Sequence, residues 1–268
     1  MKRKFAVIGV GNMARSIISG ITSNDIPVSN FYLYDKFSSV CDNYKNIDAF
    51  SIENSIQNAI KDADCVLLSI KPQNYAEVLE EIKGTENYNK KLYISIGAGI
   101  TSQSVSDTLD GASVVRVLPN LPMTIGMGVS VICKNEKISV EDFSFIESVF
   151  ASSGSTLLID EKDMNAIIGV TSSSPAYVFK FINAIFLGAK AQGLDSKELL
   201  NTICDMVIGS ATLLKQSTDT PEELISKVAS KGGTTEQALI KLDDGRFDET
   251  IKQAMIACTN RADELGKK

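Results

Sequence analysis

A glycine-rich turn near the start of the chain constrains the fold more than any other feature. Residues 9–14 read Gly-Val-Gly-Asn-Met-Ala, a G-x-G-x-x-A pattern between an apolar run at Phe5–Gly9 and a helical pattern at Asn12–Ile21. In such a turn the first glycine permits a tight bend, and the second lets a pyrophosphate approach the backbone. The small last residue of the pattern, Ala14, lets the helix pack on the strand. The helix N-terminus then faces the anion. The pattern predicts a dinucleotide site that includes Gly9, Gly11, Asn12 and Met13. A purely structural glycine turn is the alternative.

The first part of the chain alternates short apolar runs with amphipathic stretches. Further strands are expected at Phe31–Asp35, Cys65–Ile70, Lys91–Gly97 and Ser113–Leu118, with Val129–Cys133 and Thr156–Ile159 at one edge. Helices are expected at Asn54–Asp62 and Val140–Phe150. Apolar runs without polar alternation, separated by helices, favour a parallel sheet that is covered on both faces.

Helical periodicity dominates the rest of the chain. The expected helices are Lys162–Thr171, Pro175–Gln192, Ser196–Ser217, Pro221–Ala229, Thr235–Asp243 and Asp248–Leu265. Gly193 is placed to close one helix and Pro221 to begin another. The predicted fold class is therefore α/β. A Rossmann-type parallel-sheet domain spans residues 1–160, and an all-helical domain follows over 161–268.

Composition excludes several kinds of chemistry. The 268 residues include no histidine, so a Ser-His-Asp hydrolase, an HExxH zinc site and an imidazole base are excluded. The net charge of −6 and the absence of a basic block argue against nucleic-acid binding. The five cysteines form no CxxC pair, so we expect reduced thiols and no structural metal. No apolar stretch reaches the roughly 20 residues of a membrane span. These features predict a cytoplasmic protein that uses neither membrane nor nucleic acid.

Asp35 and Lys36 bear on the choice of cofactor. Asp35 ends the second expected strand. A carboxylate at this position typically binds the adenosine ribose hydroxyls and repels a 2′-phosphate. Lys36 partly offsets that repulsion, so the sequence favours NADH over NADPH only weakly. Two ordinary loop charges are the alternative.

Six sequence blocks carry a family resemblance. They are IGVGNMARSII, SIKPQ (Ser69–Gln73), SIGAGI (Ser95–Ile100), RVLPNLP (Arg116–Pro122), SSSPAYVF (Ser172–Phe179) and SKGGTTEQAL (Ser230–Leu239). In their order and spacing, over nearly the whole chain, the sequence resembles the pyrroline-5-carboxylate reductase family. The resemblance implies NAD(P)H-dependent reduction of a cyclic imine to L-proline.

The resemblance also assigns cofactor residues. It implies that the loop of Ser69, Ile70, Lys71 and Pro72 lies along the cofactor near the nicotinamide, and that small Ala98 and Gly99 let backbone pass close to the ring. Asn54 is expected on the adenosine side and Asn120 in the substrate cleft. For Lys71, a solvated charge at a strand end is the alternative reading.

The segment Ser230–Thr235 precedes a helix and offers unencumbered backbone N–H groups and hydroxyls, which suit a carboxylate. Ordinary helix capping explains the same residues. The resemblance implies that Ser230, Gly232, Gly233 and Thr234 hold the substrate carboxylate, and that catalytic Thr235 lies near the ring nitrogen.

The chain departs from the family pattern in two of these blocks. Family members usually carry glycine among the residues that align with Ser172–Ser174, and proline where Lys231 stands. The first departure bears on the local turn. Lys231 loosens its loop and also adds a cation near the proposed carboxylate site, and the sequence does not decide which effect is larger.

Oligomeric state follows from the helical region and the resemblance. Ile182, Ile185, Phe186 and Ala189 form one apolar helix face, and Ile203, Val207 and Leu214 form another. The resemblance favours a homodimer with a cleft between the nucleotide domain and helices of both subunits; a monomeric core explains the same periodicity. Two other functions stay open: a β-hydroxyacid dehydrogenase and a non-catalytic cofactor-binding paralogue.

Overall fold

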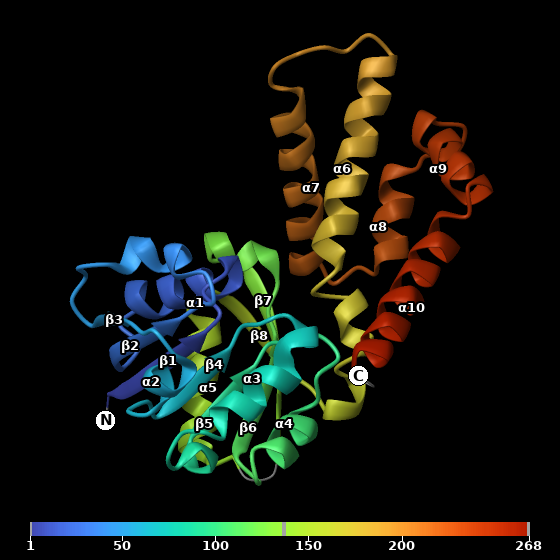
Figure 1. Cartoon of the computed structure of the whole chain (residues 1–268). Coiled ribbons are helices and arrows are strands. Elements are labelled where there is room, and N and C mark those ends of the chain that lie inside the picture. The colour runs from blue at the N-terminus through green and yellow to red at the C-terminus, as the bar shows by residue number, and fades with distance from the viewer. Residues whose placement is uncertain (1, 136–137, 267–268) are drawn as a thin grey trace. The chain divides into compact units, whose positions relative to one another are not determined.

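The computed structural model describes residues 2–135 and 138–266, which form two compact units (Figure 1). The first unit comprises Met1–Ser173 and Met255–Lys268, and the second comprises Ser174–Ala254. This division differs from the boundary expected near residue 160. The reason is a small apolar cluster at one end of the sheet, where Met164, Ile168 and Ala262 are buried together with Leu118 and Val131.

The first unit is built on one eight-stranded sheet. Its strands are β1 (Arg3–Ile8), β2 (Val28–Tyr34), β3 (Phe50–Ile52), β4 (Cys65–Leu68), β5 (Leu92–Ser95), β6 (Ser113–Leu118), β7 (Gly128–Lys134) and β8 (Gly154–Leu158). Their order is β3-β2-β1-β4-β5-β6-β7-β8. All neighbouring pairs are parallel except β6 and β7. The predicted parallel sheet is confirmed. β3 was not expected, because three residues are too few to give a clear pattern.

Helices cover both faces of this sheet (Figure 1). One face packs against α1 (Asn12–Ser23) and α5 (Val140–Ala151), and the other against α2 (Ile56–Ile60), α3 (Tyr75–Ile82) and α4 (Ser102–Thr108). Successive residues of β1 alternate between the two cores: Phe5 and Val7 face one, Ala6 and Ile8 the other. The sequence did not single out α3 and α4, which are short.

The helix expected at Lys162–Thr171 is wrong. The segment forms two short 3-10 turns, Glu161–Asp163 and Ala166–Gly169. The side chain of Arg116 is only 1% exposed and donates to Glu161 at 2.7 Å and to Asn165 at 2.6 Å. Leaving a buried ion without its partner costs about 3–5 kcal/mol. The segment therefore adopts the conformation that brings these acceptors to the guanidinium rather than a continuous helix.

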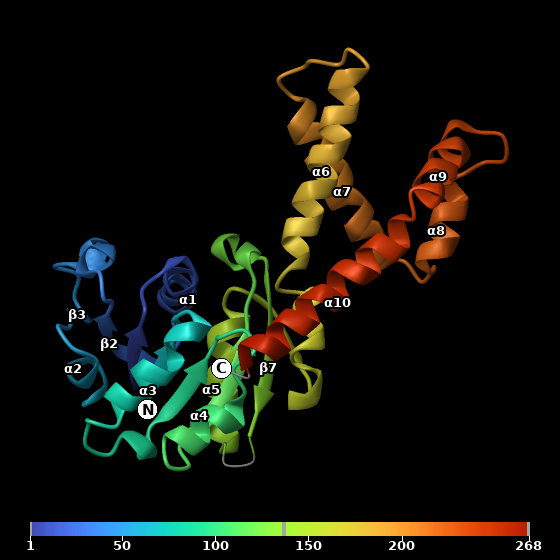
Figure 2. The same ribbon diagram turned by 45° about the vertical axis from the view of Figure 1, so that its right-hand side comes forward.

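The second unit is helical throughout its regular structure. It contains α6 (Ser174–Ala191), α7 (Leu199–Gln216), α8 (Pro221–Val228), α9 (Thr234–Asp244) and the first part of α10 (Phe247–Gly266). Figure 2 shows α6 and α7 side by side, as does Figure 1. The predicted helix boundary residues are confirmed: Pro221 lies in the first turn of α8, and Gly193 has a φ of +87° just after α6.

Short 3-10 segments also occur at Ser38–Tyr44, Pro72–Asn74, Tyr88–Lys90 and Leu121–Ile125. Among the described residues, no helix is long and apolar enough to cross a membrane. Within the same ranges, no group of three or more cysteine, aspartate or glutamate side chains is placed to hold a metal ion.

Candidate active site

The strand order locates a crevice at the carboxyl edge of the sheet. β1 pairs with β2 on one side and with β4 on the other, so the connections leave β1 and β4 in opposite directions. Open α/β sheets bind ligands outside the carboxyl ends of the strands at such a switch point. The turn after β1 and the loop after β4 therefore border the candidate site.

The turn after β1 has the geometry that its glycines predict. Gly9 has a φ of +90°, and a Cβ there would lie 2.4 Å from the carbonyl oxygen of Ser69. A side chain at Gly11 would instead meet no atom within 4 Å. Gly9 is thus needed by the fold itself. Gly11 leaves open space at the N-terminus of α1, where a phosphate group fits.

A cavity of about 360 Å³ opens in front of this turn. Seven residues predicted from sequence line it: Gly11, Asn12, Met13, Ser69, Ile70, Lys71 and Ala98. Five more complete the lining: Ile96, Leu118, Pro119, Ile168 and Ser172. The lining gathers residues from the carboxyl ends of β1, β4, β5 and β6, as a dinucleotide site at a switch point requires.

The five additional lining residues were not singled out as site residues. Four of them lie within the sequence blocks that carry the resemblance: Ile96, Leu118, Pro119 and Ser172. Their membership in these blocks is the signal from which the sequence could have identified them as site residues. The hydroxyl of Ser172 is buried and has no hydrogen-bond partner among the residues that the structure describes. It is therefore available to a ligand in the cavity.

Six of the predicted cofactor residues do not line this cavity: Gly9, Asp35, Lys36, Asn54, Pro72 and Gly99. Gly9 packs behind the turn against Ser69, as described above. Pro72 lines a different cavity, together with Tyr75 and Leu265. Gly99 has a φ of +79°, and a Cβ there would lie 2.3 Å from the carbonyl oxygen of Ala262 in α10. Its small size thus serves packing against that helix.

Asp35 holds the glycine-rich turn. Its carboxylate accepts hydrogen bonds from the backbone N–H of Val10 at 2.8 Å and of Phe37 at 2.9 Å. Hydrogen bonds to an ionised acceptor are stronger than neutral ones, so this carboxylate ties the end of β2 to the turn after β1. Lys36 beside it is exposed. Asn54, after β3, is also exposed and accepts a hydrogen bond from Asn58 at 2.8 Å.

Asn120 is engaged by backbone at both ends of its side-chain amide. Its oxygen accepts from the N–H of Val129 at 2.8 Å, and its nitrogen donates to the carbonyl of Thr171 at 3.0 Å. The residue is only 7% exposed. These bonds give Asn120 a structural role that the sequence did not predict, and contact with substrate stays a prediction.

The Ser230–Thr235 segment lies in the second unit, and Gly233 is the N-cap of α9. Gly232 has a φ of +74°, and its N–H donates to the carboxylate of Glu236 at 2.8 Å. The N–H of Gly233 donates to the carbonyl of Ser230 at 2.9 Å. One backbone N–H of the loop is thus bonded to the protein's own Glu236, and binding of the substrate carboxylate by this loop stays a prediction.

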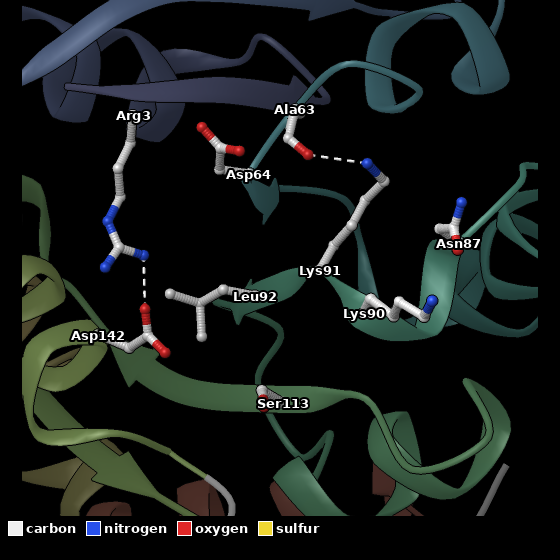
Figure 3. Close-up of a pocket in the computed structure, with 9 residues that line it drawn as sticks. All are labelled: Arg3, Ala63, Asp64, Asn87, Lys90, Lys91, Leu92, Ser113 and Asp142. Atoms are coloured by element: carbon white, nitrogen blue, oxygen red, sulfur yellow. Dashed lines mark hydrogen bonds and ion pairs between the residues drawn. The ribbon is translucent and has the colours of Figure 1, made fainter. Parts of the chain in front are cut away.

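A second cavity, also about 360 Å³, is lined by charged residues (Figure 3). It lies at the amino ends of β1, β5 and β6, where Arg3, Leu92 and Ser113 begin these strands. Arg3 pairs with Asp142 at 2.6 Å.

The cavity's buried lysine is also satisfied within the fold. Lys91 donates to the carbonyl of Lys61 at 3.0 Å. It also donates to the carbonyl of Ala63 at 2.8 Å (Figure 3). Burial lowers the pKa of Lys91. Because Arg3 and Lys91 both have partners in the fold, we assign them a structural role.

The turn, the strand order and the lined cavity are those of a dinucleotide-binding protein with a Rossmann-type sheet. A sequence profile described as NADP oxidoreductase, coenzyme F420-dependent, matches residues 4–99. A second profile, described as pyrroline-5-carboxylate reductase dimerisation, matches residues 161–265.

Curated relatives extend this likeness over the full chain. A pyrroline-5-carboxylate reductase of Haemophilus influenzae is 34% identical over 97% of this chain and 96% of its own length. One of Escherichia coli is 30% identical over 100% of both chains. The chain belongs to the pyrroline-5-carboxylate reductase family.

Solved structures agree with this assignment. The Plasmodium falciparum pyrroline carboxylate reductase with NADP bound has a TM-score of 0.89 and 26% identity, over 98% of both chains. The Streptococcus pyogenes enzyme has a TM-score of 0.90 and 28% identity, over 98% of this chain and 99% of that one. A reductive aminase from Aspergillus terreus, at 11% identity and a TM-score of 0.59, shares the fold alone.

Proposed function

We propose that this chain reduces the cyclic imine 1-pyrroline-5-carboxylate to L-proline with NAD(P)H, as the last step of proline biosynthesis. The observation that carries the proposal is the cavity at the β1/β4 switch point, which is lined by Gly11, Ser69, Lys71 and Ala98. Curated relatives that match over the full chain are named for this reaction.

The residues present fit a dinucleotide. The open space at Gly11 and the N-terminus of α1 suit the pyrophosphate. We expect Asn54, which follows β3, on the adenosine side. Ser69, Ile70, Lys71 and Ala98 then border the nicotinamide. When bound, NAD(P)H supplies the hydride. The protein's contribution is to hold the two rings at reacting distance.

The substrate's carboxylate is held by Ser230, Gly232, Gly233 and Thr234. The loop's affinity for a carboxylate is supported by its bond to Glu236, which a bound substrate would replace. Thr235, in the first turn of α9, places its hydroxyl near the imine nitrogen. Asn120 contributes through the backbone it orders, with substrate contact as a further role.

Proton delivery proceeds without an imidazole, since the chain contains no histidine. A protonated imine arrives from solvent already electrophilic, so the protein needs no strong acid. A hydroxyl such as that of Thr235 holds the nitrogen by a hydrogen bond during hydride transfer.

We expect NADH to be preferred over NADPH. A carboxylate that follows β2, as Asp35 does, typically repels a 2′-phosphate. Lys36 offsets part of that repulsion but is exposed to solvent, which screens its charge. The Plasmodium falciparum structure holds NADP, so the preference needs a direct test in this chain.

Replacing Thr235 tests the catalytic assignment. Thr235→Ala removes a hydroxyl that acts on the reacting imine, so kcat should fall by about tenfold or more while cofactor affinity is unchanged. Thr250→Ala, an exposed helical threonine whose hydroxyl bonds the Arg246 carbonyl, is the matched control. Unchanged kcat and KM in Thr235→Ala would remove Thr235 from the mechanism.

The profile match over 161–265 indicates a homo-oligomer. We infer that its basic unit is a homodimer formed through the second unit's helices, in a cytoplasmic enzyme. Light scattering on the purified protein measures the assembly.

A further inference from the structure

The phenol of Tyr75 connects two strand ends beneath the candidate cofactor site. Tyr75 begins α3 and is only 3% exposed. Its hydroxyl donates to the carbonyl of Leu68, lies 3.0 Å from the Ser95 hydroxyl and accepts the N–H of Gly97 at 3.0 Å. Leu68 ends β4 and Ser95 ends β5. One buried oxygen therefore fixes the carboxyl ends of two neighbouring strands.

The backbone beyond these two ends lines the cavity. Ser69, Ile70 and Lys71 follow β4, while Ile96 and Ala98 follow β5, and all five border the same space. If Asp35 marks the adenosine side at β2, then the other half of a dinucleotide lies over β4 and β5. The loops anchored by Tyr75 are those that face the nicotinamide.

The ring of Tyr75 imposes a second constraint. A Cβ at Gly97 would lie 2.7 Å from this ring, so the two residues fit only as a pair. The phenol is protonated at neutral pH and donates to Leu68, and burial, which raises the pKa of Tyr75 to about 12, further disfavours its ionised form. The hydroxyl thus uses both its donor and its acceptor capacity, and losing it leaves buried backbone groups short of a partner.

We propose that Tyr75 is a positioning residue for the nicotinamide half of the cofactor, an inference that rests on the proposed function. It acts through the Ser69–Lys71 and Ile96–Ala98 loops and does not touch the ligand. Its removal should therefore weaken the binding of the whole dinucleotide without weakening the binding of the adenosine half.

The experiment compares two ligands on Tyr75→Phe. Phenylalanine keeps the ring against Gly97 and removes only the hydroxyl. The dissociation constant of NADH, from its fluorescence, should rise about fivefold, because loops without the hydroxyl's bonds to Leu68 and Gly97 adopt the binding-competent arrangement less often. That of ADP-ribose, from calorimetry, should stay within about twofold of the wild type. Tyr93→Phe is the matched control, because the buried Tyr93 hydroxyl bonds the Tyr88 carbonyl away from the cavity.

A second variant guards against misfolding. Ser95→Ala removes one partner of the phenol and leaves its ring in place against Gly97, and it should weaken NADH binding more than ADP-ribose binding, as Tyr75→Phe does. Unchanged NADH binding in Tyr75→Phe, or equal weakening of NADH and ADP-ribose, would overturn the inference. Failure of the wild-type protein to bind NADH or NADPH would instead overturn the proposed function, and the inference with it.

Discussion

At the scale of single residues, Asp35 combines a structural and a selective role. Its two carboxylate oxygens bind the N–H groups of Val10 and Phe37, so the residue orders the glycine-rich turn whether or not a ligand is present. The sequence shows a carboxylate at this position but does not predict its bonds to Val10 and Phe37. Any residue supplies a backbone N–H, so a donor that folding brings close cannot be recognised from residue types.

Asp35→Asn should shift cofactor preference toward NADPH. The amide keeps one oxygen as an acceptor and removes the negative charge that repels a 2′-phosphate. The ratio of kcat/KM for NADPH over that for NADH should rise by about tenfold, which corresponds to roughly 1.4 kcal/mol. Steady-state kinetics with both cofactors measures it.

Asp42→Asn provides the control for that measurement. Asp42 is an exposed neighbour that pairs with Lys45 at 2.8 Å, and its replacement makes the same change in net charge. If Asp35→Asn and Asp42→Asn change the ratio equally, the assigned selectivity is wrong.

At the scale of elements, the two glycines in the turn between β1 and α1 have different roles, one in the fold and one in ligand binding. Gly9 adopts a positive φ in contact with Ser69, whereas Gly11 faces open space. The sequence motif presents the two as parts of one phosphate cradle, and only the geometry separates the glycine that the fold needs from the one that the ligand needs.

Gly9→Ala should therefore lower the stability of the fold, whereas Gly11→Ala should lower the affinity for the cofactor. Gly9→Ala should lower the free energy of unfolding by about 1–3 kcal/mol, because it combines a strained backbone with a steric clash. Gly11→Ala should unfold at the wild-type temperature but bind NADH about tenfold or more weakly, because its methyl group occupies the space for the pyrophosphate. Thermal unfolding and fluorescence titration separate the two. A destabilised Gly11→Ala with normal affinity would contradict this division.

Strong periodicity made most elements predictable. The long helices α6, α7 and α10 and the buried strands were predicted with small errors at their ends. Short elements such as β3, α3 and α4 carry too few residues for a clear pattern. The segment after Asp160 was misread because its conformation is set by the distant, buried Arg116, a tertiary effect that local periodicity does not contain.

At the scale of the whole molecule, the helices of the second unit leave many large apolar side chains exposed. They include Phe179, Phe181, Leu187, Met206, Ile208 and Leu213. Monomeric proteins rarely expose large contiguous apolar patches, so these side chains favour burial against a partner. The side chains that the sequence assigned to one such surface, Ile182, Ile185, Phe186 and Ala189, are half-buried within the single chain. An apolar helix stripe has the same pattern whether it packs within a chain or between chains.

The exposed side chains predict a stable assembly. Size-exclusion chromatography with light scattering should give at least twice the 28.9 kDa of one chain. Introducing a glutamate at both Phe181 and Met206 should lower that mass, because each carboxylate would be buried at the interface without a partner of opposite charge. A mass equal to one chain at assay concentration would refute the homodimer.

The central claim is the reaction itself, and following cofactor oxidation tests it most directly. The purified chain is mixed with NADH or NADPH and either 1-pyrroline-5-carboxylate or the ketoacid partners of small β-hydroxyacids. The account predicts cofactor oxidation with the cyclic imine only, with one L-proline formed per cofactor consumed. Oxidation with the ketoacids and none with the imine would identify a β-hydroxyacid dehydrogenase. Binding without oxidation of either substrate would identify a non-catalytic paralogue and contradict the account.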